Sequence, residues 1–461
     1  MVVMARGDSR RQHDGFDGQL TDCVAIGVLT ELVPRGLVDE VVDRAGRREK
    51  RVRLLPARVV VYFVLAMCLF FGDGYEEVMR KLVGGLRFLG VWRSDWRVPT
   101  TKALTQARAR LGEEPLRLLF QQVAVPVARV DTVGAFLRSW RLMAVDGVQL
   151  EVPDTAANVK AFGKNSHHGA LGPYPQARVV GLGECGTHAI VGARIGSLYR
   201  GERELAGEVL QGAGPGMLVM ADRGFYSHAL WSKAAATGAD LLWRVTVLVD
   251  LPVVEVLDDG SYLSVLGDVI ARQRYRRHVR AGRGDAVLQG CPVRVVKYRV
   301  ADRDGGDEVY RLVTTILDPQ EASALELAAA YHERWEFELA LAEIETYQRG
   351  PGRTLRSKSP EMVRQEIWAL LTTHYGIRRL MARAADQAGM DPDRLSFIRA
   401  LRVVRRHTTE QGAFSPSFPE AGHWPGTGRD PGQAQPAAVS SDLSPDRETS
   451  PSQPTPDHRT R

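Results

Sequence analysis

The sequence predicts an α/β protein in which an all-helical N-terminal region precedes a mixed β-sheet with helical cover. Between Phe16 and about Arg129, apolar residues recur at the three-to-four spacing of amphipathic helices. From Trp140 onwards, short apolar runs stop at Asp or Gly, as buried strands do when they end in turns. Helical segments then alternate with these strands, which indicates a mixed sheet covered by helices.

The N-terminal region, residues 16–129, is expected to be a small DNA-binding domain. Its apolar run Val59 to Phe71 is too short to cross a bilayer and is interpreted as a buried helix. A further helix, capped by Thr100 or Thr101, would carry Lys102 and Arg108 towards DNA. A charged, solvated face on a structural bundle explains these cations equally well. The expected helices have the sequences LTDCVAIGVLTELVP, ARVVVYFVLAMCLFF, YEEVMRKLVGGLRFL and EPLRLLFQQVAVPVA.

Residues 138–406 are expected to form a second domain. Two buried strands end in AVDG and MADRG, and a β-rich stretch follows at about 250–318. A long helix with the sequence ASALELAAAYHERWEFELALAEIETY comes next, and then a basic loop that holds Arg356, a candidate DNA contact. Residues 1–15 and the Pro- and Ser-rich tail, residues 407–461, are expected to be disordered.

Charge and cysteine usage are compatible with a polyanionic partner and a reducing compartment. The net charge is +6, but residues 407–461 hold seven acids and four Arg, so residues 1–406 carry +9. A basic body suits a polyanion because phosphate contacts release counterions. The four cysteines have neither zinc nor disulfide spacing, and neither does Cys185 with His188. The N-terminus lacks an apolar signal core, so we expect a cytoplasmic, nucleoid-associated protein with no membrane partner.

The two strand-end acids, Asp146 and Asp222, are candidate metal ligands. Neighbouring carboxylates repel each other, and a divalent cation relieves that repulsion. Two such ions would activate a water or hydroxyl and stabilise the leaving oxygen of a phosphoryl transfer. Taken singly, each Asp is more typical of an ordinary strand-ending turn than of a catalytic site.

A third acid lies on the long helix. Tyr331, Arg334 and Glu338 are three and four residues apart and therefore share one face of that helix. A carboxylate beside an Arg that is able to grip a phosphate with two hydrogen bonds suits phosphoryl transfer on DNA. Glu333 and Glu336 fall on other faces and are interpreted as solvated.

Several motifs together resemble one family. In chain order they are AVDGVQLEVPDT, YPQARVVGLGECGTHA, MADRGFYS, GADLLWRV, YRLVTTILD and YHERWEFELA. From about Phe16 to Phe414 the sequence resembles the IS-four family of bacterial DDE transposases. The resemblance implies a ribonuclease H-like mixed-sheet core with a β-rich insertion, and catalytic, metal-binding acids at Asp146, Asp222 and Glu338.

The resemblance also implies partners and cofactors. They are two Mg²⁺ ions, with Mn²⁺ as an alternative, double-stranded DNA in the form of terminal inverted repeats and target, and a homodimer on DNA. It implies cut-and-paste transposition, often through a DNA hairpin. Tyr331 and Arg334 match the family's signature, and Trp335 resembles the aromatic residue that stacks on a flipped base. A core position for Trp335 is equally compatible with the sequence.

The sequence departs from the family at two places. The signature's Lys position, seven residues after Glu338, holds Glu345, which repels phosphate where a Lys would attract it. The tail after AFSPSFPE is acidic where a basic segment is expected. The principal prediction is therefore a DNA transposase, and the alternatives are a catalytically impaired remnant that only binds DNA and a ribonuclease H-type repair nuclease.

Overall fold

The computed structural model describes residues 33–51, 55–84, 97–167, 170–282, 286–301 and 307–409. These residues form two compact units. The first draws on Met1–Phe136, Asp146–Val209 and Glu336–Pro431, and the described part of the second on Leu137–Val145 and Leu210–Trp335. The expected disordered segments, 1–15 and the tail beyond residue 409, lie outside the described residues, as does most of the first expected helix.

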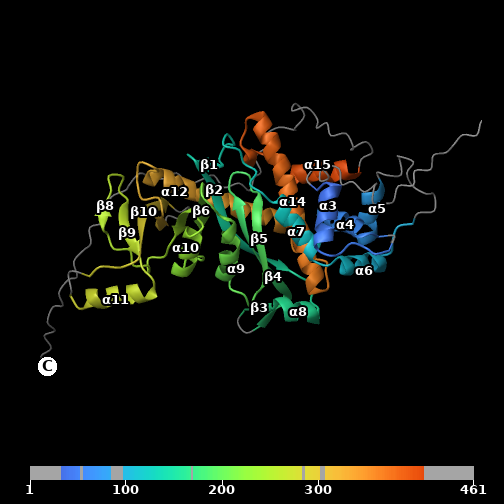
Figure 1. Cartoon of the computed structure of the whole chain (residues 1–461), viewed down its shortest axis with the longest axis horizontal. Coiled ribbons are helices and arrows are strands. Elements are labelled where there is room, and N and C mark those ends of the chain that lie inside the picture. Colours follow the sequence, from blue (N-terminus) through green and yellow to red (C-terminus); the bar gives the residue numbers. More distant parts are fainter. Residues whose placement is uncertain are drawn as a thin grey trace, which may run out of the picture. The chain divides into compact units, whose positions relative to one another are not determined.

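The first unit combines the N-terminal helices with part of the sheet and the C-terminal helices (Figure 1). Its helices are α3 (Arg35–Arg44), α4 (Ala57–Leu69), α5 (Tyr75–Gly84), α6 (Thr101–Leu111), α7 (Glu114–Val123), α8 (Ala156–Phe162), α9 (Glu202–Val209), α14 (Pro360–Ala388) and α15 (Phe397–Thr409), with a π-helical segment η3 (Glu343–Gln348) and a 3₁₀ turn η4 (Pro392–Arg394). Its strands are the second half of β2 (Trp140–Glu151), β3 (Lys164–His167), β4 (Ala170–Glu184) and β5 (Ile190–Ser197).

Helix α4 is the core of the N-terminal helices, as its apolar run predicts. Every residue of α4 except Arg58 is buried. The Tyr62 hydroxyl donates to the Val33 carbonyl at 2.8 Å. The long helix α14 packs against α4 and α7. The Thr100 hydroxyl caps α6 by accepting from Ala103 N at 3.3 Å, which confirms one of the two expected caps.

The second unit is a mixed sheet with helices. Strand β2 pairs in parallel with β6 (Met217–Ala221), which pairs in parallel with β7 (Asp240–Arg244). Antiparallel pairs then connect β7, β11 (Asp307–Thr314), β10 (Cys291–Ala301), β9 (Tyr262–Leu266) and β8 (Glu255–Val256). Its other elements are α10 (His228–Ala235), α11 (Val269–Arg280), α12 (Ala324–His332) and η2 (Leu210–Gly212); β1 (Phe136–Leu137) and α13 (Arg334–Ala342) run across the unit boundary.

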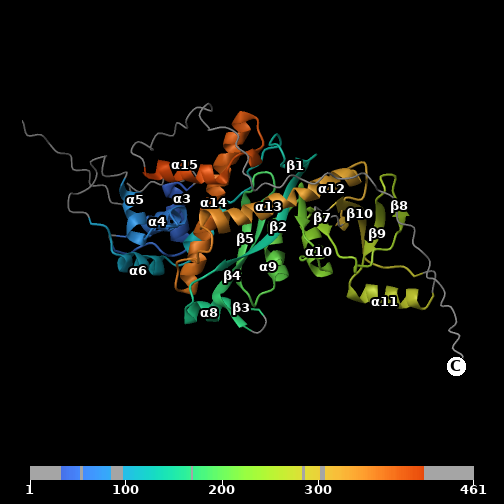
Figure 2. The same cartoon turned by 180° about the vertical axis from the view of Figure 1, so that it is seen from behind.

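Two local expectations differ from the structure. The basic segment inside the β-rich stretch forms a helix, α11, whose first turn is capped by Asp268. The long helix is interrupted at Glu333, so that α12 and α13 follow one another (Figure 2), and it ends in the π-helical segment η3.

The fold is the expected mixed α/β type. Strand β2 belongs to both units: it neighbours β4, which pairs with β5, and it pairs with β6, which pairs with β7. These neighbours make up a ribonuclease H-like sheet, and β8 to β11 form the β-rich insertion before α12. Within the described part of the chain, no helix combines the length and apolar character needed to cross a membrane.

Candidate metal and DNA site

Asp146 and Asp222 each come directly after the last paired residue of their strands, β2 and β6. Val145 of β2 lies opposite Ala221 of β6 in the parallel ladder, and this is the last registered pair of the two strands. The next residues along the chain are Asp146 and Asp222. The register therefore brings both acids to the same level of adjacent strands.

Each acid also makes a local hydrogen bond that shapes the chain after it. The Asp146 Oδ1 accepts from Gly147 N at 2.7 Å, and the Asp222 carbonyl accepts from Phe225 N at 3.0 Å in a turn. These bonds are typical of Asp where a strand gives way to a turn. The turn chemistry and a role as ligand are therefore compatible at the same residue.

The direction of the Asp146 side chain follows from its neighbour. A Cβ at Gly147 would lie 2.3 Å from Glu202 Oε1, so position 147 faces α9. Successive side chains of a strand point to opposite faces. Asp146 therefore points to the face of β2 away from α9.

Helix α13 packs on that other face of the neighbouring strands. Gly196 of β5 faces Leu205 of α9, whereas Gly181 and Gly183 of β4 face Phe337 of α13. A Cβ would lie 3.2 Å from the Phe337 ring at Gly181 and 2.2 Å from it at Gly183. The two glycines let the helix approach the strand closely, and the residue that follows Phe337 is Glu338.

Tyr331 lies beside the second acid. Its hydroxyl donates to the Ala221 carbonyl at 3.4 Å, and its side chain is buried. Burial raises the pKa of the Tyr331 phenol, and the negative charge of Asp222 raises it further although Arg334 opposes it. The phenol therefore stays protonated at neutral pH and keeps its hydrogen bond to the Ala221 carbonyl.

Arg334 lies between two aromatic rings. Its guanidinium carbon is 5.7 Å from the Tyr331 ring centroid and 5.2 Å from that of Trp335, within cation–π range. Trp335 is 49% exposed, which excludes the alternative that it is a core residue. An exposed indole beside a cation suits stacking against a base.

Sequence reasoning missed Arg244. It is the last residue of β7, directly after Trp243, which is registered with Ala221 of β6. Its guanidinium carbon lies 3.9 Å from the Tyr310 ring centroid. The sequence signal that could have identified Arg244 as a site residue is its position at the end of β7, the strand next to the one that precedes Asp222.

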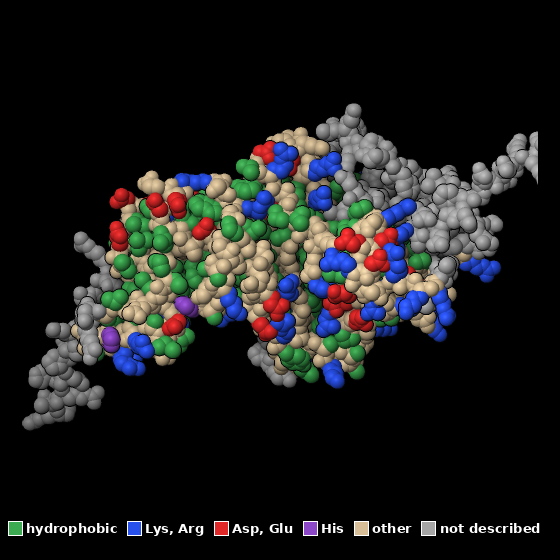
Figure 3. Space-filling view, viewed as in Figure 1, with side chains coloured by type: hydrophobic (Ala, Val, Ile, Leu, Met, Phe, Trp, Pro, Cys, Tyr) green, Lys and Arg blue, Asp and Glu red, His purple; other side chains and the backbone are tan. Residues whose placement is uncertain are grey.

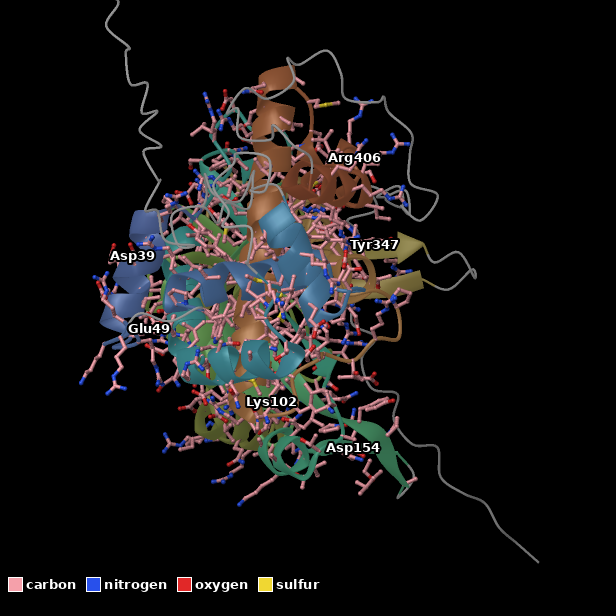
Figure 4. All side chains as sticks on the ribbon, turned by 90° about the vertical axis from the view of Figure 1, so that its right-hand side faces the viewer. Asp39, Glu49, Lys102, Asp154, Tyr347 and Arg406 are labelled. Atoms are coloured by element: carbon pink, nitrogen blue, oxygen red, sulfur yellow. The ribbon has the colours of Figure 1, made fainter. Side chains whose placement is uncertain are left out.

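The proposed DNA contacts of the N-terminal region separate into exposed and buried residues. Lys102 is exposed on α6 (Figure 4). The expectation that Arg108 binds DNA does not fit its place, because it is fully buried and donates from Nε to Gln365 Oε1 at 2.9 Å and from Nη2 to Ser357 Oγ at 2.8 Å. Arg108 is a structural residue that joins α6 to α14.

Arg356 is likewise committed to the protein. Its guanidinium donates to the carbonyls of Met67 and Asp73, and it lies 3.8 Å from the buried Glu366. Only 18% of its side chain is exposed. The loop it belongs to is thereby tied to α4, which leaves Arg356 little freedom to contact DNA.

Glu345, at the position of the family's Lys, lies in η3. Its Oε1 is 3.5 Å from Arg349 Nη2, and 46% of its side chain is exposed. Burial lowers the pKa of Arg349, and Glu345 opposes that change. The acid at this position therefore has a local partner one turn along the chain.

The three acids have the right chemistry for a divalent cation, but among the described residues the ligand atoms that lie within 4.8 Å of one another are those of His188, Glu336 and Asp393. Carboxylate oxygens are the ligands that Mg²⁺ and Mn²⁺ prefer. Asp146 and Glu338 belong to the same unit, and Asp146 points to the face on which α13 packs. Asp222 follows the strand that pairs with β2.

Comparison with known proteins identifies the family. The "Insertion element 4 transposase N-terminal" family matches residues 23–121, and the "Transposase DDE domain" family matches residues 141–375, about half of the chain. Transposase InsG for insertion sequence element IS4 from Escherichia coli K12 is 28% identical over 83% of this chain and 83% of its own length. The putative transposase InsZ from the same strain is 24% identical over 47% of this chain and 70% of its own length.

Among solved structures, the chain is similar to a piggyBac transposase in a synaptic complex with hairpin DNA. That match has 10% identity and a TM-score of 0.43, and covers 84% of this chain and 81% of the other. The family assignment depends on the sequence matches. The chain belongs to the insertion element 4 (IS4) family of DDE transposases.

Proposed function

We propose that this transposase binds the terminal inverted repeats of an insertion sequence and cleaves and joins DNA at a metal site formed by Asp146, Asp222 and Glu338. The observation that carries the proposal is the register of β2 and β6, which places Asp146 and Asp222 directly after the pair Val145 and Ala221. The face of β2 to which Asp146 points is the face that bears α13 and Glu338.

The three carboxylates would hold two Mg²⁺ or Mn²⁺ ions. Bound there, the ions would stabilise both the attacking and the leaving oxygen of an in-line displacement at phosphorus. The protein's own contribution is to hold the acids on rigid elements: two strand ends and one helix.

The residues beside Asp222 would hold the DNA strand. Arg334 is only 4% exposed, so gripping the phosphate next to the cleaved bond would require its guanidinium to turn outward from its contact with Tyr331. Tyr331 is buried and donates to the Ala221 carbonyl, so it would hold Arg334 beside Asp222 without touching the DNA itself. Trp335 would stack against a base that has left the duplex, because its indole is half exposed.

Arg244 would supply a second cation next to the strand. Its stacking on Tyr310 holds the guanidinium at the end of β7. A planar guanidinium suits recognition of phosphate oxygens and also stacks on aromatic rings. We therefore add Arg244 to the DNA-contacting residues of the proposed site.

Two surfaces would bind duplex DNA outside the cleavage site. Lys102 represents the first, on α6. Helix α11 is the second: it carries five Arg and no acid, has no buried residue, and lies under a group of basic side chains at one end of its unit (Figure 3). Contacts of this kind add affinity through counterion release without reading sequence. Action on two element ends would require two copies of the chain, so a homodimer on DNA is part of the proposal.

A plasmid assay tests the proposal. Supercoiled plasmid with paired element ends, incubated with protein and Mg²⁺ or Mn²⁺, should be nicked at those ends by the wild type. Asp222→Ala should bind the ends normally and cleave at least about a thousandfold more slowly, since a lost metal ligand removes several kcal/mol of transition-state stabilisation. Equal nicking by wild type and Asp222→Ala would refute the metal site, and cleavage without preference for the ends would favour a repair nuclease.

A second candidate function, a remnant that binds element ends without turnover, is supported by Glu345. An acid stands where the family has a phosphate-binding Lys, and nearly half of its side chain faces solvent. Such a protein would retain end binding and show no cleavage with either metal ion.

A further inference from the structure

A group of charged side chains, four of them buried and two partly exposed, lies behind the helix that carries Glu338. It collects residues from the turn after β4, from α13, η3 and α14, and from the turn η4. All of them belong to the first unit. This group, named the His188 cluster below, consists of His188, Glu336, Glu343, His374, Arg378 and Asp393.

His188 is the centre of the cluster. Its Nε2 lies 2.9 Å from Glu336 Oε2 and 3.0 Å from Asp393 Oδ1, and its Nδ1 faces Arg378 Nη2. Arg378 Nε in turn donates to Glu343 Oε2 at 2.8 Å. One imidazole thus connects α13 to α14 and to η4.

The backbone of His188 is held in an unusual conformation. Its φ is +57°, in the left-handed region that non-glycine residues seldom adopt. That conformation is strained for an L-residue. Strain of this kind persists where the surroundings determine the geometry, and it is concentrated at functional sites.

The acids around His188 favour a proton on its ring. Burial and Arg378 oppose a positive charge on the ring, but Asp393 and Glu336 outweigh them and raise the pKa of His188 to about 10. In the neutral tautomer that Arg378 would select, Nδ1 accepts and Nε2 again carries the hydrogen. The ligand atoms of His188, Glu336 and Asp393 also lie within 4.8 Å of one another, which is close enough for them to share a metal ion.

His188 contacts Glu336, which lies two positions before Glu338 in α13. Glu336, Phe337 and Glu338 are consecutive, and a helix turns about 100° per residue. Because Phe337 points at β4, Glu336 and Glu338 project to its two sides. Fixing Glu336 on one side therefore fixes the rotation of α13 about its axis, and with it the direction of Glu338.

We propose that His188 and Glu336 are positioning residues, whose buried contact sets the rotation of α13 and so directs the Glu338 carboxylate to its metal. The inference rests on the proposed metal role of Glu338. Removing a residue that orients a metal ligand typically weakens metal binding by about tenfold to a hundredfold.

Calorimetric titration of the full chain with Mn²⁺, without DNA, tests the inference independently of cleavage. Glu336→Ala and His188→Gln should each weaken Mn²⁺ binding about tenfold or more. Glu336→Gln, which can still accept from His188, should recover most of the affinity. The matched control is Asp39→Asn, which removes the partner of Arg58 between α3 and α4 of the same unit; it should lower Tm and leave Mn²⁺ affinity unchanged.

Three results would overturn the inference. One is unchanged Mn²⁺ affinity in a folded Glu336→Ala or His188→Gln variant, because the proposed site would then stand without the positioning contact. Another is the loss of one Mn²⁺ equivalent with the remaining affinity intact, because His188 would then itself be a metal ligand. If the wild type binds no Mn²⁺, or if Asp222→Ala binds it as well as the wild type, the metal site fails together with the inference.

Discussion

Phe337 lies directly over Gly183, where an added Cβ would come within 2.2 Å of the Phe337 ring. This contact seats α13 on β4 and so determines how far Glu338 stands from the sheet. The backbone around Gly183 leaves little room for adjustment, since the same Cβ would lie 3.1 Å from the Ala189 carbonyl oxygen. The glycine is thus a requirement of the helix position.

Gly183→Ala should destabilise the protein by about 1–3 kcal/mol, as overpacking of a well-filled core does. It should also weaken Mn²⁺ binding, because α13 must move outward. The measurements are thermal unfolding and Mn²⁺ titration. The control is Gly192→Ala on β5, where the nearest atoms lie at 3.8 and 3.9 Å and a methyl group fits. Equal Tm values for the two variants would contradict the packing argument.

Arg244→Ala should slow cleavage about tenfold to a hundredfold, because a hydrogen bond to a charged group contributes roughly 1.5–3 kcal/mol. Arg244→Lys keeps the charge but loses the planar stacking on Tyr310, so it should restore only part of the rate. Single-turnover cleavage of a prenicked element end measures the effect. A Lys variant as fast as the wild type would show that charge alone matters at the end of β7.

The sequence predicted the elements whose pattern is set by burial. Helix α4 is buried almost throughout and β6 ends at an Asp, and both features are visible as apolar runs. Helix α11 could not be predicted in this way because it has no buried residue and therefore no apolar periodicity. Its signal is local: Asp268 caps its first turn.

Side-chain roles were harder to predict than elements. The position of Arg108 in the sequence is typical of an exposed cation on a helix. Its structural role becomes visible only in the hydrogen bond to Gln365, which is far away along the chain. The predicted solvated role of Glu336 is wrong for the same reason, because His188 meets it from the turn after β4. Contacts between distant segments leave no periodic signal in the sequence.

Helix α11 should contribute to the salt dependence of DNA binding. Arg274→Ala and Arg277→Ala should each reduce the slope of log K against log[salt] by about one, since each removes one phosphate contact. Fluorescence anisotropy with duplex DNA at several salt concentrations measures the slope. Lys233→Ala, an exposed cation on α10 of the same unit, serves as the control. An unchanged slope in both Arg variants would remove α11 from the DNA surface.

Glu345→Lys should raise cleavage at element ends about tenfold or more. Like charges roughly 4 Å apart cost on the order of 4 kcal/mol at an effective dielectric of about 20, less where the side chain turns away. Glu345→Gln removes the repulsion without adding attraction and should give a smaller increase. Glu361→Lys, an exposed position on α14, makes the same change in net charge elsewhere. An equal gain from Glu361→Lys would show that the effect comes from net charge alone. If Glu345→Lys gives no gain, Glu345 does not limit cleavage.

Glu343 should make the first unit sensitive to acid. Burial opposes its negative charge, but Arg378, together with His188 and His374, lowers the pKa of Glu343 well below its ordinary range. A carboxyl whose pKa is depressed on folding contributes stability above its unfolded pKa, about 4.3 for Glu, and loses that contribution as the pH falls towards the folded value. Tm measured by calorimetry should therefore fall steeply below about pH 4.3.

The Glu343→Gln variant separates this carboxyl from the others. It should unfold at a lower temperature than the wild type at neutral pH, because Arg378 then loses its ion pair in the interior. Its Tm should decline less between neutral and acid pH, since the contribution that protonation removes is already gone. Glu255→Gln on the exposed strand β8 should match the wild type across the whole range. An equally steep acid decline in Glu343→Gln and the wild type would show that the charge of Glu343 is not what stabilises the cluster.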